Sequence, residues 1–344
     1  AALMAPTEVL AEQHAQSLHD LLGRIGVETV LLKGDQGAET RRDAYERIAD
    51  GRAQVTVGTH ALIQKGVEFD NLGLVITDEQ HRFGVRERQG LQRKGRMPDV
   101  LVMTATPIPR TLALTAYGDL TMTMIDKLPP GRQPIQTKRF TEKDRDHLHR
   151  FIESQLGKGR QAYVVYPLVE ESEALTDIRA AVDGHATLTQ RFPEWSVGLL
   201  HGRMRSDDKQ DVMGRFKSGA VQILVSTTVI EVGIDVPNAN VMVIENAERF
   251  GLAQLHQLRG RVGRGEYPSF CALVGWPKSE EARQRLDVLL RTTDGFEVAE
   301  EDLKIRAQAN KQREIILAEA DRTGNEVRGR GEAEAIRILA DALN

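Results

Sequence analysis

The sequence has almost no cysteine, the residue whose disulfides stabilise small secreted domains. Its 344 residues include one cysteine, Cys271, which excludes an internal disulfide and a four-cysteine zinc site. Cys271 lies in an apolar run, Ser269–Trp276, where we expect a buried strand. No run approaches the roughly 18 apolar residues of a membrane span, and no signal-peptide pattern is visible. These absences predict a cytoplasmic protein that does not cross a membrane.

An excess of charge of one sign is also absent. The chain has 46 basic and 50 acidic residues and a net charge of −4. A coat protein with a wholly basic surface is therefore excluded, whereas a motor that needs one basic groove is not. The first residue is not methionine, and the chain opens inside the apolar run Ala1–Ala5. We therefore expect the first domain to be truncated at its amino terminus.

What the sequence does have is a regular alternation of two kinds of segment. Short β-branched apolar runs alternate with helix-length amphipathic stretches, a layout typical of parallel α/β sheets. A Pro- and Gly-rich stretch, Leu128–Pro134, indicates a linker between two such domains. The expected strands are 27–32, 53–58, 72–77, 100–104, 162–166, 196–200, 221–226, 240–245 and 269–275.

Two adjacent acids follow one of these strands, in Val75–His81. Because side chains at the carboxyl end of a parallel strand reach the ligand crevice, Asp78 and Glu79 suit a nucleotide site. One carboxylate there can hold Mg²⁺ through water, while the next orients the attacking water. A solvated acidic turn is the alternative interpretation.

A polar turn, Thr104-Ala-Thr106, ends the following strand and precedes prolines. Its hydroxyls could bond to the acidic motif and relay its state to the neighbouring domain. A simple strand-to-turn signal would give a similar pattern.

The most specific motif is Gln257–Arg264, which reads Gln-x-x-Gly-Arg-x-Gly-Arg. Its glycines free the backbone to approach a ligand. Arg261 and Arg264 are three residues apart, so we expect them to share a helix face. Guanidinium groups delivered to a γ-phosphate act as arginine fingers. A plain basic surface helix would not need the interleaved glycines, which lower helix stability.

These motifs together resemble the superfamily 2 helicases, and within them the RecG family of DNA-repair helicases. Met4–Gln13 is similar to motif Ia, Val57–Ile63 to motif Ib, Asp78–His81 to motif II and Thr104–Thr106 to motif III, while Leu199–Met204, Val225–Pro237 and Gln257–Arg264 are similar to motifs IVa, V and VI. The resemblance covers residues 1 to 306. It implies two RecA-like parallel-sheet domains, the first truncated, followed by a helical carboxyl-terminal tail. The expected boundaries are 1–133, 134–276, a translocation-coupling segment at 277–306, and the tail at 307–344.

The resemblance also implies roles for individual residues. Asp78 would hold Mg²⁺ through water, Glu79 would position the attacking water, and Gln80 and His81 would couple the site to the second domain. Gln257, Arg261 and Arg264 would stabilise the γ-phosphate of ATP, with Gly233 and Asp235 supporting the same interface. The residues expected near the nucleic-acid backbone are Thr7, Thr59, His60, Thr104, Thr106, Thr227 and Thr228. For His60, a structural histidine is the alternative.

The sequence departs from the family pattern in two places. No Gly-x-x-x-x-Gly-Lys-Thr string, whose amides and lysine cradle phosphates, occurs in these 344 residues, nor does the amino-terminal domain with its branch-splitting wedge. After Thr293–Arg306, which matches the family, residues 307–344 resemble instead a helical segment of stomatin/prohibitin-like proteins. We expect this tail to be helical, interrupted near Thr323–Asn325 and Gly329–Gly331, to pack little on the motor, and to allow weak self-association. A solvated terminal helix is the alternative.

Three functions from different classes remain open at this stage. The first is the motor of an ATP-dependent DNA helicase that unwinds or branch-migrates forks and four-way junctions in recombination and repair. The second is a double-stranded DNA translocase like the transcription-repair coupling factor. The third is a non-catalytic nucleic-acid-binding fragment, which the absent phosphate-binding string favours. Strand separation distinguishes the first from the second, and nucleotide binding distinguishes the third from both.

Overall fold

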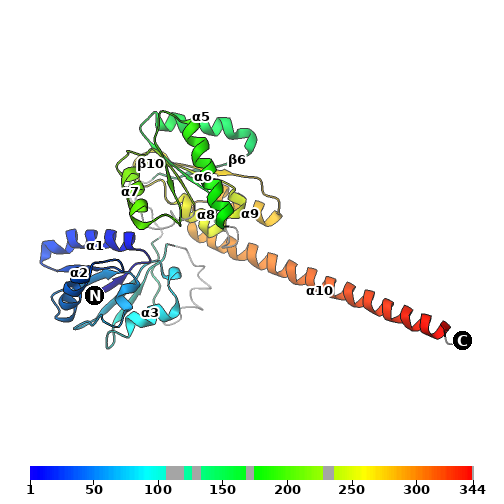
Figure 1. Ribbon diagram of the computed structural model, residues 1–344, viewed down its shortest axis with the longest axis horizontal. Coiled ribbons are helices and arrows are strands. Elements are labelled where there is room, and N and C mark those ends of the chain that lie inside the picture. The colour runs from blue at the N-terminus through cyan, green and yellow to red at the C-terminus, as the bar shows by residue number, and fades with distance from the viewer. Residues whose placement is uncertain (106–119, 126–132, 168–173, 228–235, 343–344) are drawn as a thin grey trace.

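The computed structural model consists of two α/β domains and a long carboxyl-terminal helix (Figure 1). It describes all residues except 106–119, 126–132, 168–173, 228–235 and 343–344. The predicted linker at 128–134 therefore falls mostly outside the described residues. Two parallel sheets confirm the predicted fold class. Among the described residues, no helix is both long and apolar enough to cross a membrane.

The first domain is built on a five-stranded parallel sheet. Its strand order is β2 (Thr29–Leu32), β3 (Val55–Gly58), β1 (Ala2–Met4), β4 (Leu74–Thr77) and β5 (Asp99–Val102). Helix α1 (Glu8–Leu22) covers one face, and α2 (Ala38–Ala49) and α3 (Val85–Gln92) cover the other. The hydroxyl of Thr7 caps α1 by accepting a hydrogen bond from the amide of Leu10.

The strand that ends in the two adjacent acids lies inside this sheet. Strand β4 pairs with β1 on one side and with β5 on the other. The two edge strands of the described sheet are β2 and β5. Leu101 on this strand lies beside Ile76 on the face that α1 covers, yet 47% of its surface is exposed.

The second domain is built on a six-stranded parallel sheet. Its strand order is β6 (Gln136–Phe140), β11 (Phe270–Val274), β10 (Ala239–Ile244), β7 (Gln161–Val165), β9 (Ile223–Ser226) and β8 (Val197–Leu200). Helices α5 (Arg145–Leu156) and α6 (Ala174–Arg191) pack on one face. The other face carries α7 (Ser206–Lys217), α8 (Leu252–Arg259) and α9 (Glu280–Arg291).

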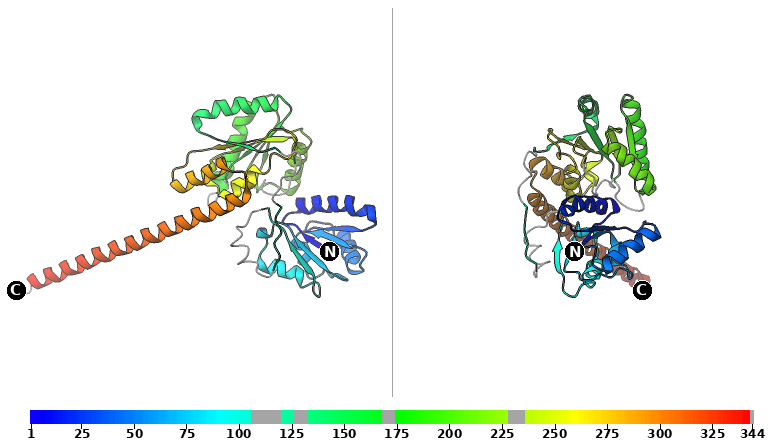
Figure 2. Two further views of the ribbon diagram at one scale, coloured as in Figure 1. Left: turned by 180° about the vertical axis from the view of Figure 1, so that it is seen from behind. Right: turned by 90° about the vertical axis from the view of Figure 1, so that its left-hand side faces the viewer.

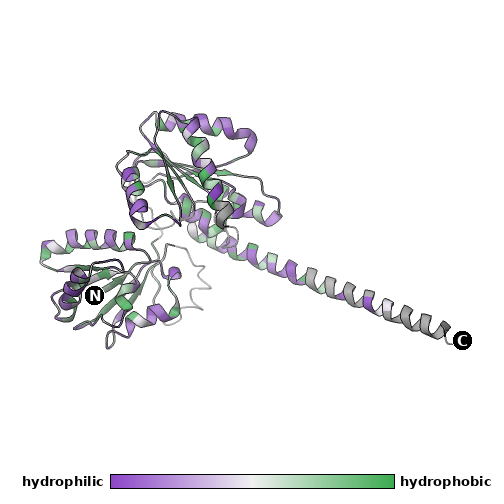
Figure 3. Ribbon diagram, in the orientation of Figure 1, coloured by the Kyte–Doolittle hydropathy of each residue, from purple (hydrophilic) through white to green (hydrophobic). Residues whose placement is uncertain are grey.

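The central strands of this second sheet are apolar on both faces. Tyr163 and Val165 on β7 belong to one core cluster, and Ala162 and Val164 belong to the other. This continuous burial is characteristic of a parallel sheet that has helices on both sides. Figure 3 shows the same layout, with hydrophobic strands inside and hydrophilic helix surfaces outside. Cys271 is buried in β11, as predicted, and burial raises the pKa of its thiol to about 12.

Helix α10 (Gly295–Ala342) leaves the second domain and runs far beyond it (Figures 1 and 2). Its first turns pack against α8 and α9, where Val298 and Ile305 are buried in the domain core. The tail is helical, as expected, but the predicted interruptions at 323–325 and 329–331 are wrong. The helix continues through Gly324, Gly329 and Gly331 without a break, because a helix interior tolerates glycine at a cost of about 1 kcal/mol for each residue.

Candidate active site

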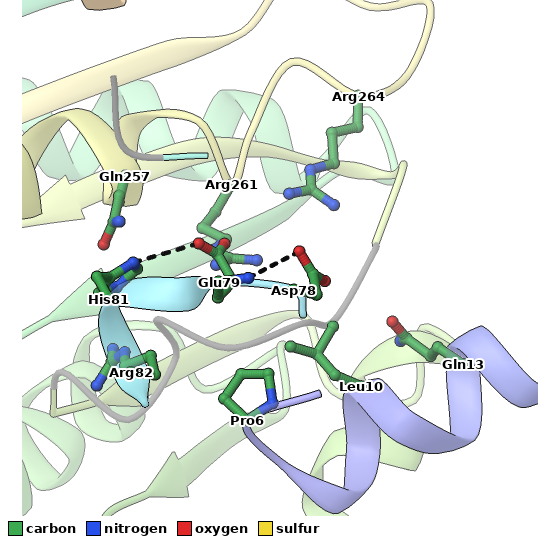
Figure 4. A pocket seen from close by; sticks show the side chains of 10 residues that line it. All are labelled: Pro6, Leu10, Gln13, Asp78, Glu79, His81, Arg82, Gln257, Arg261 and Arg264. Atoms are coloured by element: carbon green, nitrogen blue, oxygen red, sulfur yellow. Dashed lines mark hydrogen bonds and ion pairs between the residues drawn. The ribbon is translucent and has the colours of Figure 1, made fainter. Parts of the chain in front are cut away.

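A cavity of about 190 Å³ lies between the two domains (Figure 4). The first domain contributes to it the two adjacent acids of the motif after β4, and the second contributes the arginines after α8. The lining residues are Pro6, Leu10, Gln13, Asp78, Glu79, His81, Arg82, Gln257, Arg261 and Arg264. All five residues predicted to be catalytic from the sequence therefore line one cavity, although 178 positions separate Glu79 from Gln257 in the chain.

The carboxyl end of β4 fixes the two acids. The amide of Asp78 donates to the carbonyl of Met4 (3.0 Å), so this end of β4 remains tied to β1. Glu79 then adopts a left-handed conformation with φ 47° and ψ 53°, which side chains with a Cβ rarely adopt. The chain turns at this residue, and Gln80–Arg82 form a single 3₁₀ turn. The turn places both carboxylates at the cavity instead of on opposite faces of a continuing strand.

The carboxylate of Glu79 connects two predicted motifs. Its Oε2 accepts a hydrogen bond from the amide of Ala105 (3.3 Å) and lies 3.5 Å from Nδ1 of His81. Ala105 is the middle residue of the polar turn that follows β5. Contact between the acidic motif and this turn is the arrangement that the sequence predicts, and the main-chain amide of Ala105 makes such a contact. Its role as a relay remains a prediction.

A histidine that the sequence did not single out also contacts the acidic motif. Nε2 of His14 on α1 lies 2.8 Å from Oδ2 of Asp78, and the amide of Glu79 donates to Oδ1 of Asp78 (2.9 Å). Both oxygens of the Asp78 carboxylate are therefore engaged, and its orientation is fixed. His14 lies one residue beyond the motif Ia stretch, and the signal that could have found it is its position two turns into a helix that begins at the cavity.

The two arginines reach the cavity from a loop, which corrects the expectation that they share a helix face. Helix α8 ends at Arg259, and Gly260 terminates it. Gly263 has φ 78°, where a Cβ would meet Ile135 at 2.9 Å, so a glycine is needed at this turn. Arg261 is 9% exposed, and Arg264 donates from Nε to the carbonyl of Gly260 (3.3 Å). Figure 4 shows both guanidinium groups on the second-domain side of the cavity, opposite the two acids.

A neighbouring arginine, Arg259, has a structural position that the sequence did not predict. It is 2% exposed, and its Nη1 donates to the carbonyls of Leu289 (2.9 Å) and Thr292 (2.8 Å). Its Nη2 contacts Nδ1 of His256 (3.0 Å). Burial, followed by the nearby Arg259 charge, lowers the pKa of His256 to about 4. Arg259 thus ties the helix before the cavity arginines to the connection between α9 and α10.

The residues expected along the nucleic-acid backbone differ widely in accessibility. His60 and Thr104 are exposed. Thr59 and Thr227 are 3% and 0% exposed, and their hydroxyls are buried without a hydrogen-bond partner. Their amides donate to Leu32 and Leu200, respectively, so neither residue offers a group to phosphate in this arrangement. The hydroxyl of Thr7 is used to cap α1.

Five residues expected at the site from the sequence remain to be located in the structure. Thr106, Thr228, Gly233 and Asp235 lie outside the described residues. Gln80 is 5% exposed and does not line the cavity, although its neighbours on both sides do.

The donor set suits a magnesium ion that is held mostly by water and phosphate. Within the described ranges, no group of three or more histidine, cysteine or carboxylate side chains is placed to enclose a metal. Mg²⁺ keeps several waters and commonly binds through one or two carboxylates together with substrate phosphates. Asp78 and Glu79 at the cavity fit this pattern, whereas a structural zinc or calcium site would need more protein ligands.

Comparison with protein families assigns both domains. The DEAD/DEAH box helicase family matches residues 1–115, and the helicase conserved C-terminal domain matches residues 144–266. The acids lie within the first match and the arginines lie within the second. The chain is 55% identical over 307 residues to the ATP-dependent DNA helicase RecG of Synechocystis and 53% identical over 306 residues to that of Bacillus subtilis. The chain belongs to the RecG family of helicases.

Both RecG relatives are longer than this chain. The match covers 89% of the chain but 37% of the Synechocystis protein and 45% of the Bacillus subtilis protein. A solved structure of RecG bound to a three-way DNA junction matches 88% of the chain and 39% of its own length, with a TM-score of 0.73 and 47% identity. The Mycobacterium smegmatis helicase Lhr, at 17% identity and a TM-score of 0.60, shares the fold.

Proposed function

We propose that the chain is the two-domain motor of an ATP-dependent DNA helicase that acts on branched DNA in recombination and repair. One observation carries the proposal: two acids from the first domain face two arginines from the second across a single cavity. The RecG relatives are ATP-dependent DNA helicases, and one RecG structure is bound to a three-way junction. We infer that forks and four-way junctions are substrates, and that the protein works in the cytoplasm.

The positions of the acids and of Arg261 at the cavity suggest their roles in ATP hydrolysis. Asp78, fixed by His14 and by the Glu79 amide, would hold Mg²⁺ through water. Mg²⁺, when bound, would neutralise charge on the phosphates of ATP. Glu79 would orient the attacking water, because its carboxylate lies at the cavity and is held by the amide of Ala105. The buried position of Arg261 strengthens its attraction for phosphate, since surrounding protein screens charge less than water does.

ATP hydrolysis would be coupled to domain movement because the acids belong to the first domain and the arginines belong to the second. Gln257, Arg261 and Arg264 contact the γ-phosphate only while the domains are closed on it, so hydrolysis removes what holds them together. His81 beside Glu79 and Gln257 across the cavity are placed to sense this change. His60 and Thr104, which are exposed, are the residues we propose for contact with the DNA backbone.

A chimera tests this function directly. In it, residues 1–306 of this chain replace the matching segment of Bacillus subtilis RecG. We expect DNA-stimulated ATP hydrolysis and separation of a model fork, both abolished by Glu79→Gln, with the unmodified Bacillus subtilis protein as the control. A folded chimera that binds ATP but fails to hydrolyse it would contradict the proposal. Displacement of a DNA-bound protein without strand separation would favour a translocase.

The 344-residue chain alone should hydrolyse ATP negligibly. These residues contain no Gly-x-x-x-x-Gly-Lys-Thr string, and positioning of the phosphates supplies most of the catalysis of phosphoryl transfer. DNA-stimulated turnover by this chain, abolished by Glu79→Gln, would show the expectation to be wrong. We further propose that the chain self-associates through residues 307–344.

A further inference from the structure

The chain repeats one local structure at the ends of two strands, one in each domain. Strand β4 is followed by Asp78 and then by Glu79 in the left-handed conformation. Strand β10 is followed by Glu245 and then by Asn246, which has φ 49° and ψ 47°. Glu79 and Asn246 are the two non-glycine residues of the described chain with a positive φ. Because side chains with a Cβ rarely adopt this conformation, its return at the same point indicates a shared structural role.

The segment after each strand continues in the same way in both domains. A 3₁₀ turn of three residues comes next, and a phenylalanine and a glycine then precede α3 and α8. The side chain three residues after this glycine accepts a hydrogen bond from the glycine amide, at 2.8 Å in α3 and 3.1 Å in α8. The two sequences are Asp78-Glu-Gln-His-Arg-Phe-Gly84 and Glu245-Asn-Ala-Glu-Arg-Phe-Gly251. The acid, the arginine, the phenylalanine and the glycine therefore fall at matching positions.

The two segments also occupy the same place in their sheets. The strand order β2-β3-β1-β4-β5 of the first domain matches β8-β9-β7-β10-β11 in the second, where β6 adds one strand beyond β11. The amide of Asp78 donates to the carbonyl of Met4 at the end of β1 (3.0 Å). The amide of Glu245 donates to the carbonyl of Val165 at the end of β7 (2.8 Å). Glu245 therefore stands in the second domain where Asp78, the proposed magnesium ligand, stands in the first.

The two acids differ in what surrounds their carboxylates. Asp78 lines the cavity, where His14 contacts one of its oxygens. The side chain of Glu245 is 7% exposed, and both of its oxygens accept hydrogen bonds from the guanidinium group of Arg145. Nη1 donates to Oε1 (2.5 Å), and Nη2 donates to Oε2 (3.1 Å). A bidentate arginine neutralises a buried carboxylate and satisfies its lone pairs, so Glu245 is engaged inside its own domain.

Arg145 is itself held in place. It opens α5, and its Nε and Nη2 also donate to Glu142 in the preceding turn (3.2 and 2.8 Å). Burial alone would lower the pKa of Arg145, but the hydrogen bonds to Glu142 and Glu245 raise it, so the group stays charged at neutral pH. Helix α5 packs on one face of the sheet and α8 on the other. The pair of Arg145 and Glu245 therefore links the two faces at the end of β10.

The segment that starts at Glu245 leads to the arginines of the cavity. Arg261 follows Glu245 by 16 positions. Between them, Arg285 on α9 donates to two carbonyls in and just after the 3₁₀ turn (3.4 and 3.0 Å), and Arg259 ties the end of α8 to the connection between α9 and α10. Arg145 acts at the point where the segment leaves the sheet. A displacement at that point would move α8 and the loop that follows it.

We infer that Arg145 is a positioning residue for Arg261 and Arg264. Its pair with Glu245 fixes the end of β10, and thereby the point from which α8 and the arginine loop reach the cavity. Arg145 contacts no residue of the cavity and acts through Glu245. The effect on ATP hydrolysis rests on the proposed function, whereas the effect on the position of the segment does not.

Hydrogen exchange followed by mass spectrometry of the 344-residue chain tests the effect on position. Arg145→Gln leaves the Glu245 carboxylate buried without its charged partner, and we expect faster amide exchange across residues 246–264 with little change in β9. Arg145→Lys keeps the charge but loses the bidentate geometry, so it should give a smaller change in the same segment, and it serves if the glutamine variant does not fold.

The control for this measurement is Arg191→Gln. It breaks an exposed ion pair with Glu153 in the same domain and should leave exchange in residues 246–264 unchanged. Unchanged exchange in that segment in the folded Arg145 variants would overturn the inference. An equal increase throughout the second domain would also overturn it, because Arg145 would then contribute only to overall stability.

ATP hydrolysis by the Bacillus subtilis RecG chimera tests the effect on catalysis. We expect Arg145→Gln to lower kcat by roughly ten- to a hundred-fold with little change in the KM for ATP, since a misplacement of about 1 Å can cost about 10²-fold. Adding Arg145→Gln to an Arg261→Lys chimera should lower kcat little further, because both changes act through one group.

Two results in the chimera would overturn the inference. One is a parental kcat in a folded Arg145→Gln chimera, and the other is a combined loss equal to the product of the two separate losses. An inactive parent chimera would count against the proposed function alone, and hydrogen exchange in the 344-residue chain would still decide the role of Arg145.

Discussion

His14 and Asp78, 64 positions apart in the chain, are joined by a 2.8 Å hydrogen bond between Nε2 and Oδ2. This bond links α1, which begins at the cavity, to the carboxylate that we propose as the magnesium ligand. In an active chimera, His14→Ala should free that carboxylate to rotate. We expect a higher Mg²⁺ concentration at half-maximal ATP hydrolysis and a roughly ten-fold lower kcat, as for loss of a group that orients a metal ligand.

The matched control for this prediction is His19→Ala. His19 is an exposed histidine on the same helix, and its replacement should change neither quantity. Binding of Mn²⁺ in the presence of ATP, followed by electron paramagnetic resonance, gives a readout that does not depend on turnover. Equal Mn²⁺ affinity in the His14 variant and in the parent would show that the bond does not position the ligand.

Replacing Arg261 by lysine should keep its charge but lose the planar group that can reach two phosphate oxygens. In the chimera we expect kcat to fall by about 10³, the lower end of the range for arginine fingers, with a smaller change in ATP affinity. Arg283→Lys on α9, where the side chain is exposed, serves as the control. A variant Arg261→Lys that turns over at the parental rate would remove this arginine from the proposed chemistry.

The stability of the second domain should depend on the protonation of His256. Burial lowers the pKa of His256 from 6.5 to about 4, so between these pH values the unfolded chain binds more protons than the folded one. The contribution of His256 to the free energy of unfolding is therefore complete above pH 6.5. It is lost as the pH falls from 6.5 toward 4, which lowers the free energy of unfolding by at most about 3 kcal/mol. His256→Gln keeps an acceptor for Arg259 and removes the titration.

Urea unfolding at pH 7.5 and pH 5 measures this effect. We expect a smaller loss of stability at pH 5 in the His256→Gln variant than in the parent chain. Carboxylates titrate in both proteins, so the comparison between the two isolates the histidine. Parallel pH profiles would contradict the prediction.

Strand β5 should be the least protected strand of the first domain. It forms one edge of the described sheet, so the amides that face away from β4 have no described strand to pair with. Unlike the other edge strand, β2, whose Val30 and Leu32 are buried, it keeps a half-exposed leucine, Leu101. Native-state hydrogen exchange should show faster exchange in β5 than in β4 of the same sheet or in β9 of the second domain. Equal protection in β5 and β9 would show that the edge is covered in solution.

The sequence predicted most of the strands because each contains a run of apolar and β-branched residues. All nine expected strands are present, each within a few residues of its predicted bounds. Two others were missed for different physical reasons. Ala2–Met4 is only three residues long, and Gln136–Phe140 carries polar side chains because it lies at a sheet edge. The apolar run Ala1–Ala5 is too short to identify a strand by itself, and Gln136–Phe140 has no apolar run.

The sequence pointed to residues that line the cavity where a motif is local, and it gave no signal for contacts between distant residues. The acids and the arginines could be singled out because each group lies within a few residues of chain. His14 and Arg259 were missed, since the Asp78 partner of His14 is 64 positions away and the carbonyl partners of Arg259 are 30 and 33 positions away, beyond any local pattern. The shared helix face expected for Arg261 and Arg264 was wrong because Gly260 ends α8 before either residue.

The attachment of α10 has a geometric consequence for any movement of the second domain. Val298 and Ile305 clamp its first turns to that domain, and the 48 residues of the helix extend about 72 Å from its start. The helix therefore moves together with the second domain. A rotation of the second domain by about 10° would sweep the far end through roughly 12 Å, if the helix stays straight. A rotation of the second domain that shifts its own atoms only slightly would therefore displace the far end of α10 by a large distance.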